Sequence, residues 1–434
     1  YLRNNNRKFK KERMKKFIIK TLGCKVNQYD SLTLRKKLTE INFEYSQKSS
    51  NKIDLAIVNS CAVTKTSIKK GRKMLVLVKK ENPNAKIVLL GCWAKIYPEE
   101  MEKIEKDVLW GVGDPKGLVK KIKKLFAVET KKLSGNDKKQ EIHPPGQGER
   151  SRYFLKIQDG CEQFCSYCII PYSRGTLSSR SKEEVLAEIK VATLGGYDEI
   201  VLCGIHLGLY GKEKNSTTCD LKTLLEESNQ IKNVKRVRLS SIEVNDVDDR
   251  LLELMAGNEK ICQHLHLPLQ AGADKILAAM NRPYTKECFK ERAQKARKLM
   301  PDLALTTDVI VGFPGETEEN FKETMLFCQE MKFSRIHVFP FSAHEKTPAA
   351  KMKNQIKSEV KNKRARKLRK MSEQMSEEYK NNFKGRDLLA TTERILENEI
   401  QGKSEFYFNI IQKKASLGDR SPLRIGKIIR MKLE

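Results

Sequence analysis

Residues 156–175 read KIQDGCEQFCSYCIIPYSRG, and three cysteines in this stretch, Cys161, Cys165 and Cys168, are separated by three and two residues. Three thiolates this close can bind three irons of a cubane cluster and leave the fourth iron free for a small chelating cofactor. A structural zinc site is the alternative, but zinc needs four ligands and no fourth Cys or His lies nearby in the sequence. The spacing therefore favours an iron–sulfur site, with a chance cluster of cysteines as the remaining alternative.

Strand-like and helix-like stretches alternate on both sides of this motif. The strand candidates are short and apolar: 153–158, 199–202, 235–239, 263–267, 304–311 and 335–339. Helical spacing fits between them, as at 182–194 and 318–331, and a charged helical stretch at 356–379 closes the segment. Six strand–helix units without a dinucleotide-binding glycine fingerprint predict a partial or full (β/α) barrel over residues 151–383.

The segments that flank the barrel differ from it in pattern. Residues 16–130 contain strand candidates at 17–22, 54–59 and 86–91 with helical spacing between them, which predicts a small open α/β domain with a parallel sheet. Residues 131–150 are polar and rich in Gly and Pro, as in an exposed linker. Residues 384–434 alternate apolar and polar positions between glycines, which predicts a small all-β barrel that nucleic acid could contact.

Composition restricts the partners and the compartment. The 434 residues include 85 Lys and Arg against 55 Asp and Glu, a formal charge of +30 that makes a polyanion the leading partner class. No apolar run reaches the roughly 18 residues of a membrane span, and no apolar segment follows the basic N-terminal stretch. Eleven cysteines, an odd number, suit a reducing compartment. We expect a cytoplasmic protein without a membrane partner.

A second set of three cysteines emerges from position. Cys24, Cys61 and Cys92 each lie just beyond the end of a different strand candidate of the N-terminal domain. Ligand sites of open α/β sheets form at the carboxyl edge of the strands, where these thiols could converge. Three separately buried structural thiols are the alternative. Their identical placement favours a second three-cysteine cluster.

The three-cysteine motif, with the aromatic Tyr167 before its third cysteine, resembles that of the radical S-adenosylmethionine (SAM) superfamily. The resemblance implies that SAM chelates the open iron of a [4Fe–4S] cluster held by the catalytic Cys161, Cys165 and Cys168, and that its cleavage yields a 5′-deoxyadenosyl radical. Ordinary turn and barrel positions are the alternative reading of the residues that the resemblance places in the SAM pocket. Those residues are Tyr167, Gly204, Gln270, Asp308, Ile310 and Gly312.

The flanks of the second set, TLGCKVNQYDS (21–31), VNSCAVT (58–64) and GCW (91–93), resemble radical SAM methylthiotransferases. That resemblance implies a second [4Fe–4S] cluster on Cys24, Cys61 and Cys92 that carries the sulfur to be inserted, and a C-terminal barrel of the TRAM type that contacts tRNA. LGCKVNQYDS is similar to the branch acting on threonylcarbamoyladenosine. The implied reaction places a methylthio group on C2 of that nucleoside, in the anticodon loop beside the anticodon, with one SAM as methyl donor and one as radical source. An electron donor such as flavodoxin or ferredoxin is expected.

Several positions depart from the family pattern. His344 and Lys346 stand where the family has Arg and Gly, and Val244 stands where it has Pro, so local loop shape or substrate contacts differ. The basic extension before Lys16 is expected to be a solvated tail, and we assign none of the six histidines a role. Two other functions remain open: a non-catalytic RNA-binding protein with structural metal sites, and an enzyme acting on a ribosomal protein. The charge suits any of them, and no oligomeric state is predicted.

Overall fold

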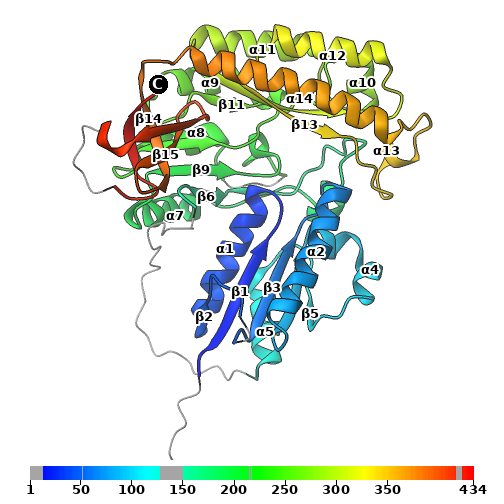
Figure 1. Cartoon of the computed structure of the whole chain (residues 1–434), viewed down its shortest axis with the longest axis vertical. Helices are drawn as coiled ribbons and strands as arrows, with labels where there is room; N and C mark the ends of the chain where they lie inside the picture. Colours follow the sequence, from blue (N-terminus) through cyan, green and yellow to red (C-terminus); the bar gives the residue numbers. More distant parts are fainter. Residues whose placement is uncertain (1–12, 51, 128–149, 215, 217, 417–422) are drawn as a thin grey trace, which may run out of the picture. The chain divides into compact units, whose positions relative to one another are not determined.

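The computed structural model describes residues 13–50, 52–127, 150–214, 216, 218–416 and 423–434. The chain forms two compact units, residues 1–132 and residues 133–434, and each is described by itself (Figure 1). Among the described residues, no helix combines the length and the apolar composition that a bilayer crossing requires. The basic tail before residue 13 and nearly all of the expected linker at 131–150 lie outside the described residues.

The first unit is an open parallel sheet with the strand order β2-β1-β3-β4-β5. Its strands are β1 (Lys15–Thr21), β2 (Phe43–Tyr45), β3 (Leu55–Ser60), β4 (Lys86–Gly91) and β5 (Val108–Leu109). Its helices are α1 (Lys25–Thr39), α2 (Lys65–Glu81), α3 (Cys92–Ile96), α4 (Pro98–Glu102) and α5 (Pro115–Leu125). The expected open α/β domain is confirmed, and the short edge strands β2 and β5 add to the three predicted strands.

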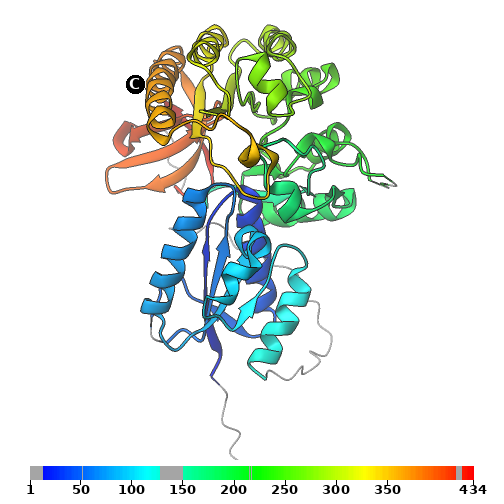
Figure 2. The ribbon, with the colours of Figure 1, turned by 90° about the vertical axis from the view of Figure 1, so that its right-hand side faces the viewer.

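Helices cover both faces of this sheet because its central strands are apolar on both sides. One core packs Leu34 and Leu38 of α1 and Ile122 of α5 against the sheet. The opposite core packs α2 and the buried Trp93 of α3 against the other face. Figure 2 shows these helices, in blue and cyan, on either side of the strands. Because helices cover both faces of the sheet, a ligand can reach it only at the ends of the strands.

The second unit contains six parallel barrel strands in the order β6-β9-β10 and β11-β12-β13, and parallel bridges from Val237 to Ile261 and from Ser241 to His266 join the two halves. The strands are β6 (Tyr153–Lys156), β9 (Glu199–Cys203), β10 (Arg236–Leu239), β11 (His264–His266), β12 (Ala304–Val311) and β13 (Arg335–Pro340). A short antiparallel pair, β7 (Gln158–Asp159) and β8 (Ser178–Ser179), follows β6. The partial (β/α)6 barrel is confirmed.

Helices follow the barrel strands along the chain. They are α6 (Ile170–Arg174), α7 (Lys182–Leu194), α8 (Leu221–Asn229), α9 (Asp249–Ala256), α10 (Asp274–Ala279), α11 (Lys286–Leu299), α12 (Glu318–Glu330), α13 (Pro348–Lys351) and α14 (Ser358–Asn381). The predicted helices at 182–194, 318–331 and 356–379 correspond to α7, α12 and α14 within two residues at each end. Single-turn 3-10 helices occur at Leu207–Leu209, Val244–Asp246 and Lys414–Ser416.

The C-terminal segment is a curled antiparallel sheet in the order β16-β15-β14-β17. Its strands are β14 (Asp387–Ile395), β15 (Glu399–Ser404), β16 (Asn409–Lys413) and β17 (Ile428–Lys432). The two outer strands approach each other, since the Lys432 backbone N–H donates to Oε1 of Gln412 at 3.0 Å. This curled sheet is the all-β element expected at the C-terminus.

Buried charges tie the curled sheet to the barrel. Glu199 of β9 is fully buried and accepts from Nε of Arg238 at 2.7 Å and from Oγ1 of Thr391 at 2.6 Å. Arg238 also donates to the backbone carbonyls of Ser404 and Glu405 at 3.1 and 3.0 Å. These bonds satisfy ionised groups that are out of contact with water.

Candidate functional site

The loop after β7 gathers the three cysteines of the barrel motif. The Cys161 backbone N–H donates to the carbonyl of Gly175 at 3.1 Å, and that of Cys168 donates to the carbonyl of Cys165 at 2.9 Å. Gly160 enters the loop at φ +74°, where a Cβ would lie 1.8 Å from the carbonyl oxygen of Thr176. Only glycine fits there, so the sharp entry into the loop is set by the sequence.

Burial and mutual proximity act on these thiols together. Burial, with smaller contributions from the neighbouring Cys165 and Cys161, raises the pKa of Cys168 to about 12 against the lowering effect of a backbone hydrogen bond from Ile170. Burial also raises the pKa of Cys165. Close sulfurs that raise the pKa of Cys165 and Cys168 suit a soft cation, which binds thiolates and offsets their charge. The donor set fits the three protein ligands of a cubane cluster.

A buried arginine contacts one of these sulfurs. Arg282 donates from Nη1 to Sγ of Cys165 at 3.2 Å, from Nε to the Tyr284 hydroxyl at 3.1 Å, and pairs through Nη2 with Glu243. Burial alone lowers the pKa of Arg282, but nearby Tyr167 and Glu243 raise it above its usual range, so the guanidinium stays charged. A fixed cation and donor therefore faces the cluster loop.

His206 contacts a second sulfur from another direction. Its Nδ1 lies 3.7 Å from Sγ of Cys161, and its Nε2 lies 2.8 Å from Oδ2 of Asp246. Burial lowers the pKa of His206, yet Asp246 and Cys161 together raise it to about 9. The sequence pattern did not single out His206, although it lies three residues beyond β9, where barrel sites collect their residues.

The predicted SAM-pocket positions occupy loops and strand ends of the barrel. Tyr167 lies inside the cysteine loop, and burial holds the pKa of its hydroxyl well above the usual range. Gly204 follows β9 directly, and a Cβ there would lie 2.7 Å from Oε1 of Gln158. Gly312 follows β12 at φ +73°. Glycine is thus required at two of these strand ends for close approach or backbone conformation.

Gln270 and the residues of β12 form a second group of these positions. Gln270 has φ +64°, donates its backbone N–H to the carbonyl of Asp308 at 2.8 Å and accepts from the N–H of Ile310 at 2.8 Å. The side chain of Asp308 lies on the same face of β12 as Ile310, with Oδ1 3.3 Å from Nε2 of His266. The structure therefore brings Gln270 against both Asp308 and Ile310, and the Asp308 carboxylate also contacts a histidine.

The N-terminal cysteines converge at one edge of the first unit's sheet. Cys61 follows β3, Cys92 follows β4 and begins α3, and Cys24 is the N-cap of α1 after β1, and these three strands are neighbours. Burial, with smaller contributions from the nearby Cys92 and Cys24, raises the pKa of Cys61 to about 11. A Cβ on Gly23, the residue before Cys24, would lie 3.1 Å from Sγ of Cys61. The three cysteines therefore lie close together at one edge of the sheet.

Helix N-termini favour metal binding at this edge. The N–H groups in the first turns of α1 and α3 are directed toward the end at which Cys24 and Cys92 lie. Such ends carry a partial positive charge that stabilises thiolates. The Val63 N–H also donates to Sγ of Cys61 at 3.5 Å. The set matches the barrel loop in ligand number and type.

The departures from the family pattern lie in ordered surroundings. His344 is 1% exposed, and its carbonyl accepts from the N–H and the hydroxyl of Thr347 at 2.8 and 2.7 Å. Val244 is buried at the start of a 3-10 turn, and Lys346 is exposed.

A six-stranded partial barrel with a three-cysteine loop after its first strands defines a radical SAM protein, and residues 155–328 match the family model "Radical SAM superfamily". Residues 16–113 match "Uncharacterized protein family UPF0004". The protein is similar to the radical SAM methyltransferase TsrM from Kitasatospora setae, with a TM-score of 0.57 and 14% identity over 78% of this chain and 77% of that one, a likeness of fold alone.

Sequence relatives narrow the class. The threonylcarbamoyladenosine tRNA methylthiotransferase MtaB of Bacillus subtilis is 40% identical over 343 residues, 77% of this chain and 75% of the relative. The Aquifex aeolicus protein of that name is 34% identical over 90% of this chain and 97% of its own. A tRNA-2-methylthio-N(6)-dimethylallyladenosine synthase of Acetivibrio thermocellus is 34% identical over 81% and 75%. The chain belongs to the MtaB-type family of radical SAM methylthiotransferases.

Proposed function

We propose that this protein inserts a methylthio group at C2 of N6-threonylcarbamoyladenosine in tRNA, beside the anticodon. The observation that carries the proposal is the pair of three-cysteine sets, Cys161, Cys165 and Cys168 in the barrel and Cys24, Cys61 and Cys92 in the first unit. MtaB relatives at 34–40% identity support the choice of nucleoside. A single-cluster enzyme would not account for the second set.

Radical SAM proteins use a [4Fe–4S] cluster and SAM, and we propose a second [4Fe–4S] cluster on Cys24, Cys61 and Cys92. When bound, these groups supply a radical that removes the C2 hydrogen and a methylated sulfur that replaces it, with one SAM consumed for each role. The chain's own residues bind these groups and orient them. The three barrel cysteines leave one iron without a protein ligand, which is the position that SAM requires.

The residues around the barrel loop hold that geometry. Arg282 donates to the sulfur of Cys165, and the ring of His206 contacts the sulfur of Cys161, so the loop is held from two sides. We propose that SAM binds along the nearby strand ends. The residues assigned to that pocket are Tyr167, Gly204, Gln270, Asp308, Ile310 and Gly312, and the Asp308 carboxylate is considered again below.

We propose three domains, an N-terminal methylthiotransferase domain at 16–130, a radical SAM domain at 151–383 and a TRAM-like RNA-binding domain at 384–434, with a linker at 131–150. A cavity of about 710 Å³ between β13, α14 and the curled sheet supports the RNA assignment. Its lining includes Arg335, Arg369, Lys380, Lys403 and Tyr407. Cations beside aromatic rings suit a nucleic-acid backbone and its bases.

The RNA surface is tested by removing charge from the cavity. Arg335→Gln and Lys403→Gln are expected to weaken tRNA binding and to reduce the slope of log affinity against log salt by about 1 per lost phosphate contact. Lys322→Gln on the exposed face of α12 serves as the control. Binding that is equal in all three variants would refute this surface. An electron donor such as flavodoxin or ferredoxin, and a cytoplasmic location, complete the proposal.

The function is tested with two triple variants in which one cysteine set at a time is replaced by Ala. The barrel variant is expected to lose SAM cleavage altogether. The Cys24→Ala, Cys61→Ala, Cys92→Ala variant is expected to cleave SAM to 5′-deoxyadenosine when reduced but to form no methylthio nucleoside. Mass spectrometry of tRNA nucleosides and of 5′-deoxyadenosine follows both products, and circular dichroism checks the fold. Normal methylthio product from the second variant would overturn the proposal.

A further inference from the structure

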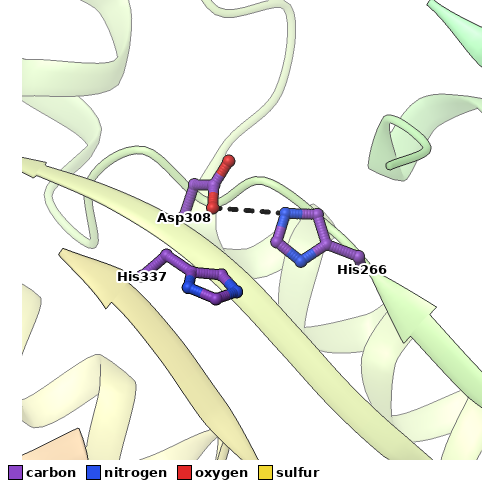
Figure 3. A group of neighbouring side chains, drawn as sticks. All are labelled: His266, Asp308 and His337. Carbon is purple, nitrogen blue, oxygen red and sulfur yellow. Dashed lines mark ion pairs between the residues drawn. The ribbon is translucent and has the colours of Figure 1, made fainter. Parts of the chain in front are cut away.

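Three side chains with metal-ligand chemistry meet on one face of the barrel sheet. His266 ends β11, Asp308 lies in β12 and His337 lies in β13. His266 pairs with Thr306 and Asp308 pairs with His337 in the two parallel ladders, and Thr306 and Asp308 share a face of β12 because side chains alternate along a strand. Figure 3 shows the two imidazole rings and the carboxylate pointing toward one another.

The distances suit a shared ion. One ligand atom from each of the three residues lies within 4.8 Å of the others. Nε2 of His266 is 3.3 Å from Oδ1 of Asp308, and the two imidazole centroids are 5.7 Å apart. Ligand atoms around a tetrahedral zinc at about 2.0–2.1 Å lie roughly 3.3 Å apart, so small side-chain rotations close the site.

A hydrogen bond behind His266 sets its ring for binding. Oγ1 of Thr306 lies 2.9 Å from Nδ1 of His266 and 3.0 Å from Nε2 of His264, and Thr306 is buried. When Nδ1–H donates to this hydroxyl, the Nε2 lone pair is left facing the Asp308 carboxylate. A cation between them satisfies both groups, and metal-binding histidines commonly have such a partner on the far nitrogen.

We propose that His266, Asp308 and His337 bind one divalent transition-metal ion of the kind that prefers nitrogen and oxygen ligands, such as Zn²⁺. Two histidines and one carboxylate form a recurrent three-ligand set that leaves further positions open to water or an oxygen donor. The cavity that is lined by Thr306 and His337 reaches this cluster. The assignment gives the Asp308 carboxylate a role in addition to the one proposed in the SAM pocket, and it does not depend on the function proposed above.

The test uses the full chain with both cysteine sets first loaded anaerobically with iron and sulfide, so that thiols are occupied. After equilibration with buffered Zn²⁺, elemental analysis is expected to find one zinc per chain. Zinc-edge X-ray absorption should show nitrogen and oxygen neighbours at about 2.0–2.1 Å and no sulfur. Asp308→Asn and His337→Phe are expected to weaken zinc binding by roughly 100-fold or more, and Thr306→Val by roughly 10-fold to 100-fold.

The control is Asp249→Asn, which alters an exposed carboxylate of α9 that pairs with Arg292 and Lys295. Visible absorption of the clusters and circular dichroism show whether each variant is folded and loaded. Zinc bound equally by Asp308→Asn, His337→Phe and the wild type would overturn the proposal. So would a sulfur neighbour, which would place the zinc on cysteines, or no zinc uptake by the wild type, which would leave His266 and Asp308 as an ion pair only.

Discussion

Arg282 reaches Cys165 across 117 positions of sequence and brings a permanent positive charge to its sulfur. A hydrogen bond to a cluster-binding sulfur stabilises the reduced, more negative cluster and so raises its reduction potential. Because Arg282 also pairs with Glu243 and bonds to Tyr284, its position against the sulfur is fixed. In the proposed enzyme, Arg282 would therefore tune the reduction potential of the barrel cluster although it binds no iron.

Arg282→Lys is expected to lower the reduction potential of the barrel cluster by roughly tens of millivolts. Lysine keeps the positive charge but lacks the planar guanidinium that donates to Cys165, Tyr284 and Glu243 at once. A redox titration followed by electron paramagnetic resonance measures the shift. Arg292→Lys, which alters an exposed pair with Asp249 at 2.7 Å, is the matched control. An unchanged potential in folded, iron-loaded Arg282→Lys would contradict the role.

The residues of the candidate site could be predicted from sequence only where they are close together along the chain. Cys161, Cys165 and Cys168 lie within eight positions, so their spacing alone indicates a shared ligand. Arg282, Glu243 and His206 could not be found in this way, because an arginine, a glutamate and a histidine are ordinary residues until folding brings them to the loop. The His266, Asp308 and His337 cluster likewise depends on the register of three strands.

A single glycine, Gly91, makes the turn between β4 and α3 and so determines the position of Cys92. Gly91 has φ +99°, and a Cβ there would lie 2.3 Å from the carbonyl oxygen of Ser60 and 2.6 Å from Oδ1 of Asn59. The neighbouring strand therefore passes too close for any other residue. This tight turn lets α3 begin at the cysteine itself.

Gly91→Ala is expected to displace Cys92 and to remove the first unit's cluster, halving the iron per chain, besides conformational strain of about 1–3 kcal/mol. Gly113→Ala is the matched control, because Gly113 also has positive φ, +122°, but a Cβ there meets nothing within 4 Å. Iron analysis and calorimetry separate the two effects. Full iron content in folded Gly91→Ala would show that the turn does not position the ligand.

Element prediction succeeded where hydrophobic pattern and length agree. The six barrel strands and α7, α12 and α14 are apolar or periodic over enough residues to be recognised from sequence. The edge strands β2 and β5 have three and two residues, too few for a pattern. Helix α1 begins at Lys25, and its first turn holds one apolar residue, Val26, which is too little pattern to locate that start from sequence.

At the scale of the second unit, Glu199 links the barrel interior to the curled sheet. Burial alone raises the pKa of Glu199, yet Arg238, Arg236 and Arg152 lower it from 4.5 to about 2. A depressed carboxyl pKa stabilises the fold fully above the unfolded value near 4.5, and that stabilisation is lost as pH falls toward 2. The shift corresponds to about 3 kcal/mol.

Glu199→Gln is expected to destabilise the second unit by about 3–5 kcal/mol at pH 7, because two buried arginines lose their carboxylate. The difference in unfolding free energy from wild type should narrow between about pH 4.5 and pH 2, because the carboxyl of Glu199 then protonates in the unfolded chain and weakens the wild type's advantage. Calorimetry across this pH range gives the comparison. Glu226→Gln, in an exposed pair with Arg250 at 3.0 Å, should change stability by less than about 1 kcal/mol. A pH-independent difference for Glu199→Gln would contradict the linkage.

The bonds from Arg238 to the carbonyls of Ser404 and Glu405 span 166 and 167 positions, and that from Thr391 to Glu199 spans 192. A ribosome that has made every barrel strand has therefore not yet made the partners of the charges inside the barrel. The nascent barrel carries ionised groups without their final partners until the last strands emerge. Its completion is set by the end of translation, and a message truncated before residue 391 would yield a product that quality-control proteases can recognise.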